Sequence, residues 1–247
     1  MLKTYHTEYF EKQAAAYGIT LSEKQLMQFM DYYELLVEWN SFMNLTAITE
    51  FDEVIVKHFL DSITLGFAFS KADLSFSGKE KVIDIGTGAG FPGIPLKIVY
   101  PDMQITLLDS LNKRIKFLNA VIDKLGLTGI EAVHGRAEDF SKPGQLREQY
   151  DLCVSRAVAN LSTLSEYCLP YVKEGGYFVP YKSEKTQDEI KDAGNALNIL
   201  GGEIIKQVEY DLADTDIYRN LLFIRKCKKT PAKYPRKSGL PAKEPLK

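Results

Sequence analysis

The sequence contains few of the residues that build cross-linked or membrane-embedded proteins. Its three cysteines, Cys153, Cys168 and Cys227, are odd in number and far apart, which predicts neither a disulfide framework nor a zinc site. No apolar run approaches the roughly 18 residues that cross a bilayer, and the first residues lack the apolar core of a signal peptide. We therefore expect a cytoplasmic chain without a membrane or metal site, and nothing demands more than a monomer.

Basic residues are concentrated at the C-terminal end. Nine of them, and the single acid Glu244, lie between Arg225 and Lys247, so this segment carries +8 while the whole chain carries −2. A positive segment beside an acidic body is typical of proteins that bind a polyanion. The alternative is a solvated tail that has no partner.

The first 70 residues predict a helical extension. Ser22 and Gln25 form the pattern of a capping box, in which each side chain accepts a hydrogen bond from the other residue's backbone N–H. A helix should run from there to about Asn40, with a shorter helix before it and helical turns between Val54 and Phe67. Apolar residues recur at three and four positions and predict one buried stripe: Leu26, Phe29, Met30, Tyr33, Leu36 and Val37.

From Lys81 onward, β-branched runs alternate with helical patterns. The alternation predicts an α/β fold with a parallel, doubly wound sheet, and two final strands without a helix between them predict an antiparallel hairpin at one edge. The expected strands are 81–84, 104–109, 130–134, 150–155, 177–180, 204–210 and 221–225; the expected helices are 92–100, 111–125, 161–172 and 184–200. We thus expect a helical cap over 1–70, a domain over 71–226, and a basic tail packed on or near it over 227–247.

Three glycines spaced two apart, Gly86, Gly88 and Gly90, follow the first of these strands. Dinucleotide-binding loops have the spacing G-x-G-x-x-G, which would require a glycine where this chain has Phe91. Asp84 would repel a pyrophosphate but suits a ligand that carries positive charge and no phosphate. S-adenosylmethionine has an ammonium and a sulfonium group, so we expect it to bind at Asp84, Gly86 and Gly88.

Further candidate residues follow the next strands at the same sheet edge, where open α/β sheets bind ligands. Asp109 is suited to accept hydrogen bonds from both ribose hydroxyls of the donor. Ala137 is expected to lie flat against adenine, and Glu138 to accept a hydrogen bond from the adenine amino group. The alternative for Glu138 is an acid at the start of a helix, where the helix dipole favours negative charge. Arg156 is expected where the transferred methyl emerges, the alternative being a structural ion pair.

The chain resembles the RsmG (GidB) family of bacterial small-subunit ribosomal RNA methyltransferases in the identity and the order of its motifs. Members of this family methylate N7 of one guanine in the decoding-region loop. The resemblance covers nearly the whole chain and is carried by Trp39-Asn40, Asn44-Leu45-Thr46, His58-Phe59-Leu60-Asp61-Ser62, the loop 84–95, Asp109-Ser110, Lys113-Arg114, Gly135-Arg136-Ala137-Glu138, Ser155-Arg156-Ala157, Lys182 and the segment 228–239.

The resemblance implies a class I, Rossmann-like methyltransferase fold with a mostly parallel seven-stranded sheet and an N-terminal helical extension. It implies that S-adenosylmethionine contacts Gly86, Phe91, Ala137, Glu138 and Arg156, and that the partner is 16S ribosomal RNA or a small-subunit assembly intermediate. The tail residues expected to bind this RNA, with one aromatic ring stacking on a base, are Lys228, Lys229, Lys233, Tyr234, Arg236 and Lys237.

The residues after the fourth strand agree with methylation of a ring nitrogen. Methylases of exocyclic amines carry an Asn/Asp-Pro-Pro-aromatic run there, and cytosine C5 methylases need a Pro-Cys nucleophile, whereas this chain has SRAVANL. Guanine N7 has a free lone pair and loses no proton, so its methylation needs alignment and a water-poor site rather than a general base. Arg156 and Lys182 are expected to position the guanine through O6 or a phosphate.

Three other functions remain open at this point. They are another S-adenosylmethionine-dependent RNA methyltransferase, a nicotinamide-dependent oxidoreductase, and a ribosome-associated RNA-binding module without turnover. Asp84 and Phe91 argue against the oxidoreductase, and measured donor affinity separates an enzyme from a module.

Overall fold

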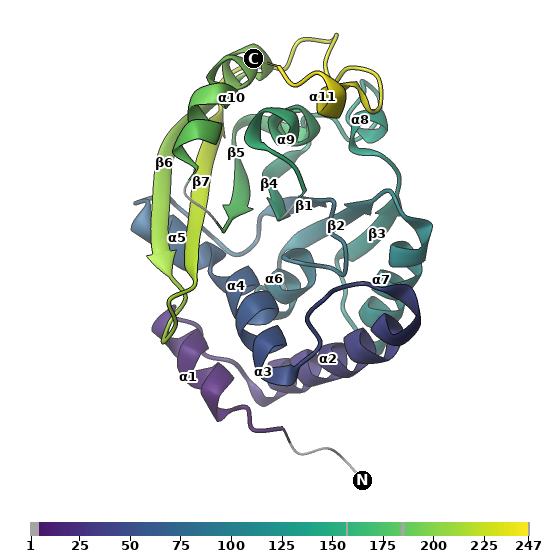
Figure 1. Ribbon diagram of the computed structural model, residues 1–247, viewed down its shortest axis with the longest axis vertical. Helices are drawn as coiled ribbons and strands as arrows, with labels where there is room; N and C mark the ends of the chain where they lie inside the picture. Colours follow the sequence, from purple (N-terminus) through teal and green to yellow (C-terminus); the bar gives the residue numbers. More distant parts are fainter. Residues whose placement is uncertain (1–4, 157, 184–185, 247) are drawn as a thin grey trace.

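The computed structural model describes residues 5–156, 158–183 and 186–246, and a seven-stranded sheet in the order β3-β2-β1-β4-β5-β7-β6 forms its centre (Figure 1). Neighbouring strands from β3 through β5 are parallel, and β7 runs antiparallel between β5 and β6. The predicted fold class is confirmed, including the hairpin at one edge. The strands are β1 (Lys81–Ile85), β2 (Gln104–Asp109), β3 (Ile130–His134), β4 (Tyr150–Arg156), β5 (Val172–Lys182), β6 (Gly202–Asp211) and β7 (Tyr218–Lys226).

Helices cover both faces of the sheet. Successive strand side chains point to opposite faces, so Val82 belongs to one buried cluster and Ile83 to the other. On the Val82 side lie α6 (Gly93–Val99) and α7 (Asn112–Leu125); on the Ile83 side lie α9 (Leu161–Cys168) and α10 (Gln187–Leu200). The short helices α8 (Ala137–Phe140) and α11 (Leu240–Lys243) both contact α9.

Two boundaries differ from the prediction by four residues or more. Helix α9 ends at Cys168 instead of Val172, because Pro170 lacks the N–H that a longer helix needs, and the 3-10 turn η2 (Leu169–Tyr171) follows. Strand β5 then begins at Val172, earlier than expected, and its pairing with β4 is irregular between Tyr150 and Leu152. The last helix was expected from Glu184, which lies outside the described residues.

The N-terminal residues form helices, as predicted. They are α1 (Glu8–Ala16), α2 (Glu23–Met43), α3 (Phe51–Val54), the π-helical turn η1 (Ile55–Leu60), α4 (Asp61–Ile63) and α5 (Leu65–Lys71). The capping box is confirmed: Ser22 Oγ accepts from Gln25 N at 3.3 Å, and Gln25 Oε1 accepts from Ser22 N at 2.9 Å.

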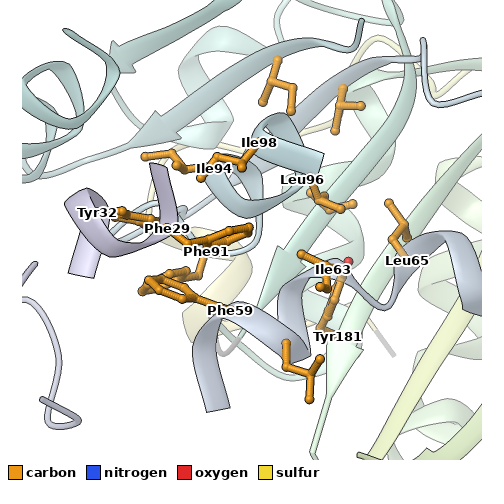
Figure 2. Packing of buried hydrophobic residues seen from close by; sticks show 14 of the residues in the cluster. Phe29, Tyr32, Phe59, Ile63, Leu65, Phe91, Ile94, Leu96, Ile98 and Tyr181 are labelled. Carbon is orange, nitrogen blue, oxygen red and sulfur yellow. The ribbon is translucent and has the colours of Figure 1, made fainter. Parts of the chain in front are cut away.

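The predicted buried stripe on α2 is wrong at one residue. Val37 is 36% exposed, whereas Tyr32, which the spacing did not select, is fully buried. The Tyr32 ring stacks on Phe59 and lies against Phe91 of the glycine loop, and its hydroxyl donates to the carbonyl of Ala89 (Figure 2). The N-terminal helices therefore share a core with the loop that follows β1.

Candidate active site

The glycine loop connects β1 to α6 and is fixed by Asp84. Asp84 Oδ2 accepts hydrogen bonds from Thr87 Oγ1 at 2.7 Å and from the Gly93 backbone N–H at 2.9 Å. The carboxyl is fully buried, and this burial raises its pKa to about 6. Asp84 thus holds both ends of the loop, a role that the sequence did not reveal. Its second oxygen, Oδ1, makes no hydrogen bond with the described residues, and its contact with a cationic ligand stays a prediction.

A pocket of about 490 Å³ lies beside this loop, at the carboxyl ends of β1, β2 and β3, and we call it the glycine-loop pocket. Gly86 has φ +69°, and a Cβ there would meet Val158 Cγ2 at 2.7 Å, so a glycine is needed at this point of the loop. The volume is in the usual range for small-molecule sites. The lining comprises the predicted Gly86, Asp109, Ala137 and Glu138 together with Ile85, Leu108, Ser110, Arg114, Gly135, Arg136, Val158, Tyr167, Gly239 and Ala242.

Asp109 places a buried carboxylate in this pocket. Oδ2 accepts from the Gly88 backbone N–H at 3.0 Å and from Arg114 Nη1 at 3.1 Å, while Oδ1 accepts from the Leu111 backbone N–H at 2.9 Å. A carboxylate offers about four lone-pair positions, so capacity remains for a ligand hydroxyl. Gly88 does not line the pocket, and its N–H instead orients Asp109.

Glu138, at the start of α8, faces both the pocket and the tail. Its side chain is nearly buried, and Oε1 accepts a hydrogen bond from the Gly239 backbone N–H at 2.8 Å. The preceding Ala137 is held by its carbonyl, which accepts from Tyr171 Oη at 2.7 Å. Both residues lie in the predicted pocket, while their contacts with adenine stay a prediction.

A second pocket of about 690 Å³ opens beside the ends of β4 and β5, and we call it the arginine pocket. Val158 lines both pockets, so the two adjoin. They meet where the strand order reverses between β1 and β4, which is the usual position of a ligand site in this architecture. The polar residues of its lining are Lys57, His58, Asp61, Arg156, Lys182, Ser183, Thr186, Asp188, Glu189 and Arg219.

Two arginines share one buried carboxylate in the arginine pocket. Arg156 Nη1 lies 2.8 Å from Asp61 Oδ2, and Arg219 Nε lies 2.6 Å from Asp61 Oδ1. The Arg156 guanidinium also lies 5.0 Å from the centre of the Phe91 ring. Arg156 therefore forms the ion pair considered as its alternative role and lines a pocket as well. Phe91 is 6% exposed. Its ring packs against the Arg156 guanidinium, and it does not line the glycine-loop pocket.

His58 packs against the same cluster. Its ring stacks on Phe91 with 4.5 Å between centroids, Nδ1 lies 3.3 Å from Arg156 Nη2, and Nε2 lies 2.9 Å from Thr46 Oγ1. Burial, followed by the Arg156 charge, lowers the pKa of His58 to about 4. At neutral pH this imidazole is uncharged and a weak base.

Lys182 also lies in the arginine pocket, as predicted. Its ammonium group donates to the carbonyl of Ala159 at 3.1 Å and pairs with Glu189 Oε2 at 2.7 Å. Lys182 and Arg156 come from the ends of the adjacent strands β5 and β4.

Comparison with known proteins identifies the relatives of this chain. The family model for rRNA small subunit methyltransferase G (GidB) matches residues 25–216. The ribosomal RNA small subunit methyltransferase G of Lachnoclostridium phytofermentans is 55% identical over 229 residues, 93% of each chain. That of Limosilactobacillus reuteri is 50% identical over 240 residues, 97% of this chain and 98% of that protein. This chain belongs to that family.

The fold agrees with the family. A solved SAM dependent methyltransferase from Aquifex aeolicus, 16% identical, matches with a TM-score of 0.50 over 72% of this chain and 94% of that one. The glycine-loop pocket of the present methyltransferase also fits S-adenosylmethionine, because the Gly86 backbone and the buried Asp109 carboxylate that line it suit a ribose-bearing ligand without phosphates.

The sequence analysis did not select His58, Asp61 or Arg219 as site residues, although His58 and Asp61 belong to a motif that carries the family resemblance. A signal existed for the first two, since residues three apart in helical turns lie on one face. Arg219 gave no signal, because only the antiparallel return of β7 brings it to Asp61.

The tail, residues 227–246, is folded back on the domain rather than extended. Tyr234 is 8% exposed, and Arg236 is held by Glu166 of α9 through contacts of 2.7 to 3.1 Å. Tyr234 is thus packed in the core and Arg236 is paired with Glu166 in this structure, while the predictions that Tyr234 stacks on a base and that Arg236 binds phosphate stay predictions. The remaining candidates are exposed and stay predictions: Lys228, Lys229, Lys233 and Lys237.

Two observations bear on other kinds of site. Among the described residues, no group of three or more His, Cys, Asp or Glu side chains is arranged to hold a metal ion. Over the same residues, no helix is both long and apolar enough to cross a membrane.

Proposed function

We propose that this protein transfers a methyl group from S-adenosylmethionine to N7 of a specific guanine in 16S ribosomal RNA. One observation carries the proposal: a pocket suited to the donor and a pocket lined by arginines lie side by side and share Val158. The names of the close relatives support ribosomal RNA of the small subunit as the acceptor.

The glycine-loop pocket would hold the donor. Gly86 lines this pocket with its backbone, and Asp109 is positioned by Gly88 and Arg114 to accept a ribose hydroxyl. Ala137 and Glu138 line the part beyond Asp109, and we assign them to adenine. When bound, S-adenosylmethionine supplies an electrophilic methyl group; the protein's residues supply only binding and orientation.

The arginine pocket would hold the guanine. Arg156 has free donor capacity because a guanidinium carries five N–H groups, and it is suited to guanine O6 or to a neighbouring phosphate. Lys182 lies at the end of the next strand and serves the same purpose. Phe91 fixes the plane of the Arg156 guanidinium, so the orientation of the base follows from the buried core beneath it.

None of the described acids and bases that line this pocket is both buried and unpaired with a pKa near neutrality, which supports N7 as the acceptor atom. Among the described lining residues, Asp61 is shared by two arginines, Glu189 pairs with Lys182, and His58 has its pKa lowered to about 4. The remaining carboxylate, Asp188, is exposed. Methylation of N7 releases no proton at the reacting atom, so alignment is sufficient.

A direct test uses small ribosomal subunits and 16S ribosomal RNA from a strain that lacks the corresponding methyltransferase. The protein is incubated with each and with S-adenosylmethionine carrying a tritiated methyl, and the RNA is digested to nucleosides for mass spectrometry. We expect 7-methylguanosine. A methyl on an exocyclic amine, on C5 of cytosine or on a ribose would overturn the reaction class, and binding of RNA without any methyl transfer would support the module instead.

The same experiment compares the amount of methyl transferred to naked 16S ribosomal RNA and to small subunits, and this comparison shows which of the two is the substrate. We further propose a cytoplasmic protein that acts as a monomer. Sedimentation of the protein alone tests the latter.

A further inference from the structure

The tail closes one side of the glycine-loop pocket. Gly239 and Ala242 line this pocket although they lie beyond the last strand of the sheet. The Gly239 backbone N–H donates to Glu138 Oε1, a side chain of the same lining, at 2.8 Å. The segment that the sequence assigned to RNA is thus in contact with the proposed donor site.

Several independent contacts fix the tail in this position. Arg147 donates to the carbonyls of Thr230 at 2.5 Å and Tyr234 at 2.8 Å, and Thr163 Oγ1 donates to the carbonyl of Pro241 at 3.1 Å. These contacts come from the loop before β4 and from α9, so the tail is attached along its length.

Arg236 is the strongest of these attachments. Its guanidinium meets both oxygens of Glu166, whose side chain is 1% exposed, and its backbone N–H donates to Glu166 Oε1 at 2.7 Å. Arg236 Nη2 also donates to the carbonyl of Glu244 at 2.7 Å, which closes the tail into a loop around Gly239. Charge-assisted hydrogen bonds of this kind are roughly twice as strong as hydrogen bonds between neutral groups.

We infer that the segment from Arg236 to Ala242 is a wall of the methyl-donor site and that Arg236 is the positioning residue that holds this wall. The inference rests on the proposed function in taking the glycine-loop pocket as the S-adenosylmethionine site. Two of the lining residues, Gly239 and Ala242, are available only when the tail is attached, so donor affinity depends on a segment outside the α/β sheet. A wall that excludes water from one side of a ligand increases the buried fraction of that ligand and slows its release.

The test measures S-adenosylmethionine affinity by calorimetry, without RNA, in the full chain and two variants. In the first, the chain ends after Pro235, which retains the Thr230 and Tyr234 contacts and removes the wall. In the second, Arg236→Ala removes the side-chain contacts with Glu166 and Glu244 and retains the backbone N–H contact with Glu166. We expect the dissociation constant to rise about tenfold or more in both variants, with faster donor release.

Lys243→Ala is the matched control. Lys243 carries the same charge as Arg236, follows the wall directly without lining the pocket, is exposed, and its side chain makes no hydrogen bond or ion pair with the described residues. Its donor affinity should equal that of the unchanged protein. Thermal unfolding without donor checks that each variant is folded, and the Arg236→Ala and Lys243→Ala pair decides the matter if the shortened chain does not fold.

The outcomes separate the two proposals. If the full chain binds S-adenosylmethionine and Arg236→Ala binds it equally well, Arg236 does not hold the wall and its assigned role fails. If the folded chain that ends after Pro235 also binds S-adenosylmethionine equally well, the wall is not part of the donor site and the whole inference fails. If the full chain itself shows no affinity for S-adenosylmethionine, the proposed function fails first.

Discussion

Asp61 shows how one buried side chain organises the proposed acceptor site. Its carboxylate is 2% exposed and joins an arginine at the end of β4 to another at the start of β7. Removing one partner of such a buried cluster leaves an uncompensated charge, which costs far more than the loss of a surface pair. Arg156 is consequently held in place by groups that do not themselves need to touch RNA.

Arg156→Ala should separate turnover from RNA affinity. We expect kcat to fall by about 100-fold, the magnitude usual for loss of one positioned donor, with a much smaller change in the dissociation constant for RNA. Arg156→Lys should recover little, because an ammonium group cannot span Asp61 and the base together. Steady-state methyl transfer and filter binding measure the two quantities. An unchanged kcat with weakened RNA affinity would make Arg156 a general RNA contact.

His58 should make stability depend on pH. Its pKa is lowered from 6.5 to about 4 in the folded protein, so its contribution is fully present above pH 6.5 and is lost as the pH falls through about 4. The shift corresponds to roughly 3 kcal/mol of unfolding free energy. His58→Asn should remove this dependence, as measured by urea unfolding from pH 4 to 8. The control is His6→Asn, since His6 is exposed. Parallel stability curves for the His58 variant and the unchanged protein would contradict the assignment.

At the level of whole elements, β7 and the tail both complete the two pockets and present exposed basic residues, and the sequence pattern does not separate these two roles. Strand β7 delivers Arg219 to Asp61, and the segment after it returns across α9 to Glu138. The basic residues accordingly divide into those that attach the tail, such as Arg236, and those that point to solvent. Only the second group is available to a phosphate backbone.

The exposed tail lysines should account for part of the salt dependence of RNA binding. If Lys229, Lys233 and Lys237 each contact one phosphate of a looped strand, replacing all three with Ala should flatten the slope of log affinity against log salt by about 2, at about 0.7 per contact. Filter binding across salt concentrations measures this slope. Equal slopes would remove these lysines from the RNA site. The charge-matched control replaces three exposed lysines elsewhere: Lys24, Lys71 and Lys206.

Over the whole molecule, the N-terminal helices and the sheet form one packed unit. Phe59 is fully buried and lies within 5.3 Å, centroid to centroid, of Phe29 and Tyr32 on α2, and 6.1 Å from Phe91 of the glycine loop (Figure 2). The boundary near residue 70 is therefore a division of the sequence rather than of the core, and independent folding of the two parts stays untested.

Phe59→Ala tests this unity. We expect a loss of about 3 to 5 kcal/mol in unfolding free energy, as is usual for a buried phenylalanine. The single tryptophan, Trp39 on α2, reports on the N-terminal helices, and circular dichroism reports on the whole chain. The two urea transitions should coincide and move together in the variant. A Trp39 transition that precedes the other would show that the helices unfold alone. Phe42→Ala, at a side chain that is 65% exposed, is the control.

The sequence by itself determined the sheet, its hairpin edge and the residues that follow its strands, because period-two and helical patterns and glycine spacing act locally. The tertiary structure alone decided what those residues face. Asp84 and Gly88 hold other groups, Arg219 joins Asp61 across 158 residues of sequence, and the basic tail turns back to the glycine-loop pocket. These outcomes depend on contacts between distant segments, whose geometry is set by packing and by the pairing of buried charges, and no local pattern contains that information.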